Sequence, residues 1–138
     1  MKKIFALVFI ITILMLVSCD SKEMRNYYSD KDNYVVATGE VTHIKYNDDR
    51  TALYIGLSRV EGPAYNDTYK FVGKNLTIVR ENGIDGKLKI GDRIEFVTAP
   101  DTFGNGYVLP IVEITVNGEK LLSFDEGFIN LNDWLAEK

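Results

Sequence analysis

Apolar and polar residues alternate along Thr51–Val60, which places Leu53, Ile55 and Leu57 on one face of an extended chain. A period of two residues is typical of a β-strand that buries one face, and it does not suit a helix. The preceding run, Val35–Tyr46, is rich in β-branched and aromatic residues, and a polar turn cluster separates the two runs. Together they predict a long antiparallel hairpin.

Turns that contain glycine or asparagine divide the residues after this hairpin into further short segments. We expect four more strands, at Phe71–Arg80, 93–97, Tyr107–Val116 and Glu119–Leu122. The intervening segments are interpreted as loops or turns, at Glu61–Lys70, Glu81–Lys87 and Pro100–Gly106. No helix of ten or more residues is expected among the strands.

Two local signals add detail to this pattern. Gly39 lies inside the first strand, where a glycine usually marks a bulge or a strong bend. Near the C-terminus, Asn130 or Asn132 can cap a short helix. Its apolar residues fall at helical spacing on one face, at Leu131, Trp134 and Leu135.

The segment LKIGDRIEFV, residues 88–97, resembles the turn-and-strand element through which OB-type barrels enter their fourth strand. Five main strands, a long bent first strand and a coiling hairpin suit the same architecture. The resemblance implies an all-β domain, a small five- or six-stranded OB-like barrel followed by a short C-terminal helix. Because no helix is predicted between the third and fourth strands, a trimmed OB fold and a different small barrel both remain open.

The N-terminus has the features of a secretory leader. Lys2 and Lys3 precede an apolar run from Ile4 to Val17 that only Thr12 interrupts. A helix of these residues would be about 21 Å long, which is short of the ~30 Å hydrocarbon core of a bilayer. The run is therefore interpreted as the apolar part of a signal peptide, with a short transmembrane anchor as the alternative.

The junction Leu16–Val17–Ser18–Cys19 resembles the lipobox of bacterial lipoproteins. This resemblance implies cleavage between Ser18 and Cys19, and a diacylglyceryl group on the Cys19 thiol. Two or more acyl chains make membrane anchoring stable. The chain would then be held on the bacterial cell membrane by Cys19, with its domain facing outside the cytoplasm.

These features divide the chain into three parts. Residues 1–18 are expected to be the signal peptide, 19–33 the lipidated cysteine and a flexible tether, and 34–138 the β-barrel domain. The tether is polar and without period, and its Tyr27 and Tyr28 could contact either the membrane or the domain. A chain of 138 residues allows one such domain and makes two improbable.

Charge and residue counts narrow the classes of function. Without the two leader lysines, 14 basic residues stand against 20 acidic ones, so the remaining chain has a net charge of −6. Such a domain lacks the basic surface that nucleic-acid binding requires. The single cysteine excludes a disulfide framework. The lone His43 and the turn pair Asp48–Asp49 do not have metal-ligand spacing, so neither a metal nor a cofactor is expected.

Aromatic residues next to two of the loops are the candidate ligand contacts. Tyr65 and Tyr69 accompany the second loop, and Phe103 and Tyr107 accompany the fourth. In OB barrels such loops flank the ligand-binding face, so a peptide, a glycan or an envelope protein is the expected partner. The same side chains could instead close the ends of the barrel.

No nucleophile motif, phosphate-binding loop or dinucleotide motif is recognised, since Cys19 would be lipidated and Ser58 and Ser123 lie in no nucleophile elbow; a non-enzymatic binding module of the cell envelope is therefore the favoured function. The alternative is a small envelope hydrolase that uses a carboxylate pair in acid–base chemistry. Its candidate residues are Glu40, Glu95 and Glu113. No catalytic residue is assigned from the sequence.

Overall fold

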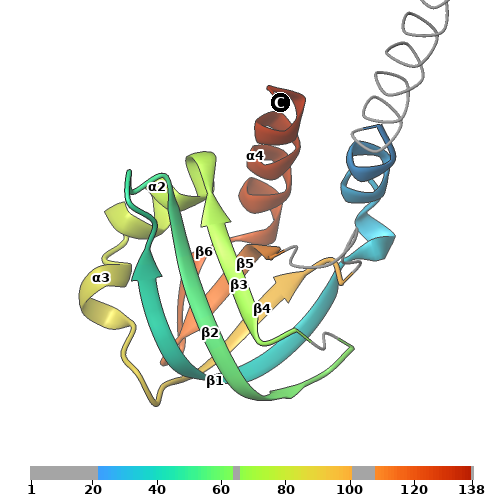
Figure 1. Cartoon of the computed structure of the whole chain (residues 1–138). Coiled ribbons are helices and arrows are strands. Elements are labelled where there is room, and N and C mark those ends of the chain that lie inside the picture. The colour runs from blue at the N-terminus through green and yellow to red at the C-terminus, as the bar shows by residue number, and fades with distance from the viewer. Residues whose placement is uncertain (1–21, 64–65, 101–107, 138) are drawn as a thin grey trace, which may run out of the picture.

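The computed structural model describes residues 22–63, 66–100 and 108–137 (Figure 1). Six strands form one mostly antiparallel sheet in the order β3-β2-β1-β4-β5-β6. The strands are β1 (Val35–Tyr46), β2 (Ala52–Glu61), β3 (Thr68–Val72), β4 (Arg93–Thr98), β5 (Leu109–Val116) and β6 (Glu119–Leu122). β3 also pairs in parallel with β5, so each of the first five strands pairs with at least two others. The expected β-rich domain with a C-terminal helix is confirmed.

β1 pairs with two neighbouring strands along its length. It pairs with β4 over Val35–Glu40 and with β2 over Thr38–Tyr46. An irregularity lies in the shared region as expected, but the extra residue is in β2, where Arg59 has a φ of 52°. Gly39 allows a close approach there, because a Cβ at this position would lie 3.1 Å from Leu57 Cδ1.

Burial on the hairpin agrees with the alternation in the sequence. Leu53, Ile55 and Leu57 are all buried on the inner face of β2. They pack with Phe71 of β3, Phe96 of β4 and other apolar residues of the sheet in one hydrophobic cluster. Removal of this apolar surface from water is the main stabilising contribution to such a fold.

The segment between β3 and β4 differs from its expectation. The third strand ends at Val72, and α2 (Gly73–Glu81) and α3 (Ile84–Lys87) follow. The predictions of a strand as far as Arg80, of a turn over Glu81–Lys87 and of no helix in this connection are therefore wrong. Leu76 and Val79 are spaced for one helix face and are buried in the main cluster, so tertiary packing selects the helix.

The C-terminal helix begins earlier than expected. α4 runs over Phe124–Ala136, and its N-cap is Ser123, whose hydroxyl accepts a hydrogen bond from the Glu126 N–H. Ser123 and Glu126 have the spacing of a capping box. Asn130 and Asn132, the predicted caps, lie inside the helix.

The segment expected to be a flexible tether is folded where the structure describes it. Residues 22–28 are helical, and a short 3₁₀ turn, η1 (Lys31–Asn33), leads into β1. Tyr28 is fully buried in a second hydrophobic cluster with Leu131 and Leu135 of α4. The Tyr28 carbonyl accepts hydrogen bonds from the Tyr34 hydroxyl at 2.7 Å and from Asn132 Nδ2 at 3.0 Å. These contacts hold the segment against α4, and so Tyr28 contacts the domain.

The leader, with Ser18 and Cys19, lies outside the described residues. Within the described ranges, no helix is long and apolar enough to cross a membrane.

Candidate functional site

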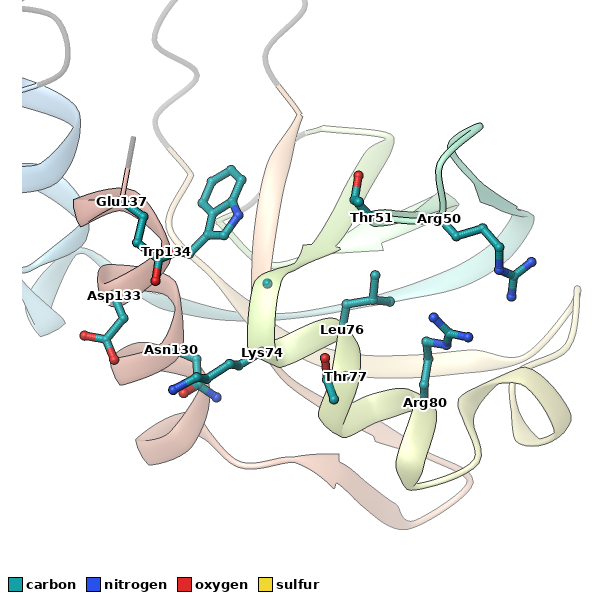
Figure 2. A pocket seen from close by; sticks show the side chains of 11 residues that line it. Arg50, Thr51, Lys74, Leu76, Thr77, Arg80, Asn130, Asp133, Trp134 and Glu137 are labelled. Atoms are coloured by element: carbon teal, nitrogen blue, oxygen red, sulfur yellow. The ribbon is translucent and has the colours of Figure 1, made fainter.

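A cavity of about 530 Å³ opens between the β1–β2 turn, α2 and α4 (Figure 2). The turn contributes Arg50 and Thr51, and the other lining residues come from the two helices and the C-cap of α4: Gly73, Lys74, Leu76, Thr77, Arg80, Asn130, Asp133, Trp134 and Glu137. Its volume is within the range of small-molecule sites. Three of the lining side chains are basic, although the chain as a whole is acidic.

Side-chain hydrogen bonds shape the β1–β2 turn and present Arg50 to the cavity. Asn47 donates to the Thr51 hydroxyl at 2.9 Å and accepts from the Ala52 N–H at 2.9 Å. Asp49 accepts from the Thr51 hydroxyl at 2.6 Å, and these bonds lower the pKa of the Asp49 carboxyl. Arg50 itself has a φ of 59°, a left-handed conformation at the tip of the turn.

The Tyr46 ring, at the end of β1, is the common neighbour of two arginines. The Arg50 guanidinium carbon lies 4.0 Å from its centroid and that of Arg80 lies 5.5 Å from it. Both contacts are of the cation–π kind. The Tyr46 hydroxyl donates to Asp85 at 2.6 Å. Burial and this bond raise the pKa of Tyr46, and the two arginines partly oppose the rise.

Basic side chains of the cavity lack acidic partners. Four ion pairs form within the described part of the chain, and none includes Arg50, Lys74 or Arg80. The carboxylates of the lining are Asp133 of α4 and Glu137, the C-cap of that helix, and they lie on the opposite wall from the two arginines (Figure 2). The cavity therefore has two arginines at one end and two carboxylates on the α4 side, toward which the Lys74 side chain also extends (Figure 2).

A buried polar network fixes α4 against α2. Asn75, which is 1% exposed, donates to the Gly127 carbonyl at 2.9 Å and accepts from Asn130 Nδ2 at 3.1 Å. Trp134 packs on Gly73, where a Cβ would lie 2.8 Å from the indole Cδ1. Both helices that line the cavity are thus held in place without a ligand.

The structure places the candidate aromatic contacts differently from the sequence-based expectation. Tyr69 is fully buried, with its ring 4.8 Å from that of Phe96, so it is not a surface contact and fills the interior instead. Burial is also the main cause that raises its pKa to about 12. Tyr65, Phe103 and Tyr107 lie outside the described residues.

The candidate carboxylates are not brought into the cavity. Glu113 pairs with Lys120 at 3.0 Å and accepts a hydrogen bond from the Phe124 N–H, while Glu40 faces Arg59 at 3.7 Å. None of Glu40, Glu95 and Glu113 lines the cavity described above.

Metal-ligand types do not gather into a site within the described ranges. His43 is exposed on β1, and its Nδ1 lies 3.2 Å from the Thr42 hydroxyl. Asp49, one of the turn aspartates, is engaged by Thr51 as described above.

Reasoning from sequence missed the residues that line the cavity. Lys74, Thr77 and Arg80 were assigned to a strand, although their spacing at i, i+3 and i+6 is that of one helix face. Recognition of that helix would have identified a polar stripe with two basic residues.

No family model matches the chain, and neither a curated protein nor a solved structure is significantly similar to it. The class of site is therefore inferred from its own residues.

Proposed function

We propose that this chain is a bacterial lipoprotein anchored to the cell membrane through Cys19, and that its domain is a non-enzymatic binding module facing outside the cytoplasm. The two lysines, the apolar run and the lipobox-like junction support the anchor. Acyl chains on one cysteine would supply the membrane affinity.

An OB-like barrel is the proposed form of the domain. Its support is a closed series of strand pairings, in which β1 pairs with β2, β2 with β3, β3 with β5, β5 with β4, and β4 again with β1. Such closure is characteristic of a small barrel. The OB pattern has a helix between the third and fourth strands, which was not predicted from the sequence. The helices between β3 and β4 agree with that pattern.

The cavity between α2, α4 and the β1–β2 turn is the observation that carries the binding function. OB barrels bind their ligands next to the loop between the first two strands, and here that loop contributes Arg50. The cavity combines basic groups without ion-pair partners, an acidic wall and an indole edge, a set suited to binding a polar ligand. The paired-carboxylate hydrolase has no comparable support, since its glutamates line no part of this cavity.

The binding function is tested by adding envelope extract to the isotope-labelled full chain in a non-ionic detergent and following its amide resonances. We expect shifts or broadening concentrated at Thr77, Arg80 and Trp134, while resonances of the exposed β4 residue Glu95 stay unchanged. Perturbations spread evenly over the domain, or none at all, would contradict the proposal.

The anchor is tested separately. Replacement of Cys19 by serine is expected to abolish labelling by radioactive palmitate and to leave the leader uncleaved. Continued labelling of the C19S variant would refute the proposed lipidation and would not affect the binding proposal.

A further inference from the structure

The basic end of the cavity brings two guanidinium groups together around one tyrosine ring. Arg50 and Arg80 lie 4.0 Å and 5.5 Å from the Tyr46 centroid, and neither forms an ion pair with another described residue. Both head groups gather at the same end of the cavity in Figure 2. Two like charges beside one ring repel one another, and an anion within reach of both guanidinium groups would be stabilised by both.

The acidic groups near this end, Asp49 and Asp85, keep their negative charge but form no ion pair with either arginine. Asp49, next to Arg50 in the chain, accepts hydrogen bonds from Thr51, and Asp85 accepts from the Tyr46 hydroxyl. The other two carboxylates of the cavity lie on the α4 wall. Glu81 and Asp85 line a neighbouring hollow with Arg80, but neither forms an ion pair with it, so the guanidinium N–H groups of Arg50 and Arg80 remain available as donors to a ligand.

We propose that this end of the cavity binds the phosphate group of a phosphate monoester, with the Arg50 and Arg80 guanidinium groups donating to its oxygens. The inference rests on the proposed binding function and specifies its ligand. A phosphate monoester carries about −1.5 to −2 charges at neutral pH, which matches two guanidinium groups better than the single charge of a carboxylate. Arginine is also the side chain best suited to bidentate contacts with phosphate.

The α4 side of the cavity restricts the organic part of the ligand, beyond its phosphate group. A volume of about 530 Å³ exceeds what a phosphate group fills, so an organic body extends toward α4. There the carboxylates of Asp133 and Glu137 repel the phosphate and accept hydrogen bonds from hydroxyl or ammonium groups. The ligand is thus a phosphate monoester that carries donors at its other end, either as a soluble molecule or as a lipid headgroup.

Isothermal titration calorimetry on the full chain in a non-ionic detergent tests this inference, with glycerol 3-phosphate, dihexanoyl phosphatidic acid and acetate as ligands. We expect glycerol 3-phosphate to bind at least ten-fold more tightly than acetate. Equal affinity for the two phosphates indicates a soluble ligand, and much tighter binding of the short-chain lipid indicates a headgroup. Either result supports the phosphate site.

Substitution of each arginine makes the test specific. Arg50→Gln and Arg80→Gln should each weaken phosphate binding by about ten-fold or more, because each removes charge-assisted hydrogen bonds. Arg59→Gln is the matched control, since Arg59 is also an exposed arginine with a positive φ, and it should leave the affinity unchanged. Arg80→Lys keeps the charge, the fold and the helix while losing the bidentate geometry, and it should bind at an intermediate level.

Affinities that are the same in the wild type and in both glutamine variants would overturn the phosphate site, as would equal binding of acetate. If the phosphates do not bind while envelope extract still perturbs Thr77 and Trp134, the ligand class is wrong and the binding function stands. If neither perturbs the cavity, both proposals are wrong.

Discussion

Replacement of Gly127 by alanine tests whether α4 is seated as closely on the sheet as the structure indicates. A glycine inside a helix is normally unfavourable, and alanine would stabilise an unconstrained helix by about 1 kcal/mol. Here a Cβ on residue 127 would lie 2.6 Å from the Val112 carbonyl carbon and closer still to its oxygen. The obstacle is backbone in the middle of β5, so neither side can move aside cheaply.

The expected cost has two contributions. Forcing an extra methyl group into a packed interface costs about 1–3 kcal/mol. A shift of α4 would also stretch the 2.9 Å hydrogen bond from Asn75 to the Gly127 carbonyl, and an unsatisfied buried amide costs about 1–3 kcal/mol. After the gain in helix propensity, we expect Gly127→Ala to lower the free energy of unfolding by about 1–5 kcal/mol.

Chemical denaturation followed by circular dichroism measures this change, and a thermal scan should show Tm lower by roughly 4–20 °C. Gly86→Ala is the matched control, because Gly86 is also helical and a Cβ there meets nothing within 4 Å. The control should be neutral or more stable than the wild type. A Gly127→Ala protein as stable as the Gly86→Ala protein would refute the close contact between α4 and β5.

Three further predictions concern other parts of the molecule. Tyr28→Ala should lower the free energy of unfolding by about 3–5 kcal/mol, because it empties a fully buried aromatic site. The control, Val36→Ala at an exposed site, should change the free energy of unfolding by less than about 0.5 kcal/mol. Equal effects of the two substitutions in urea denaturation would mean that the N-terminal segment is not docked. Tyr69 has a raised pKa of about 12 in the folded state, so its contribution to stability is complete below pH ~10 and is lost as the pH rises toward 12. Tyr69→Phe should reduce this alkaline loss, as seen in urea denaturation between pH 9 and pH 12, and an unchanged profile would contradict it. Hydrogen bonds from Thr51 lower the pKa of Asp49, so the contribution of the Asp49 carboxylate to stability is present above pH ~4 and is lost on acidification. Asp49→Asn should therefore flatten the fall in the free energy of unfolding below that pH. A pH profile identical to that of the wild type would contradict this prediction.

Strands were predictable where one face is buried and the other exposed. Leu53, Ile55 and Leu57 alternate with polar or small residues, and no helical spacing competes with that pattern. The irregularity beside Gly39 was also predicted, but its place in β2 was not, because the extra residue is an arginine with an unusual φ. Such a conformation leaves no mark in composition.

Helices were not predicted where a short apolar run fits both the two-residue period of a strand and the 3.6-residue period of a helix. Leu76, Ile78 and Val79 satisfy both a strand and a helix, and only their packing against the sheet decides between them. In α4, Gly127 has no Cβ, and this lets the helix lie close to the Val112 backbone of β5. The spacing of Ser123 and Glu126 was the available signal for the true start.

The cavity could not be found from the sequence for a related reason. Arg50 and Arg80 are thirty residues apart, and they converge only because α2 replaces the expected strand and turns Arg80 toward Tyr46. Because a strand was predicted where α2 forms, the convergence of Arg50 and Arg80 could not be predicted either. Tyr69 shows the converse error, since an aromatic next to a loop can belong to the interior.

Docking of the N-terminal segment on α4 has a consequence for how the domain would stand on a bilayer. Three peptide steps separate Cys19 from Lys22, the first described residue of the docked segment, and three steps span at most about 11 Å. A flexible linker of fourteen residues would instead let the domain wander over about 20 Å. With a lipidated Cys19, the height and tilt of the domain above the headgroups would be set by the fold, so the cavity beside α4 would keep a nearly constant orientation toward the membrane plane.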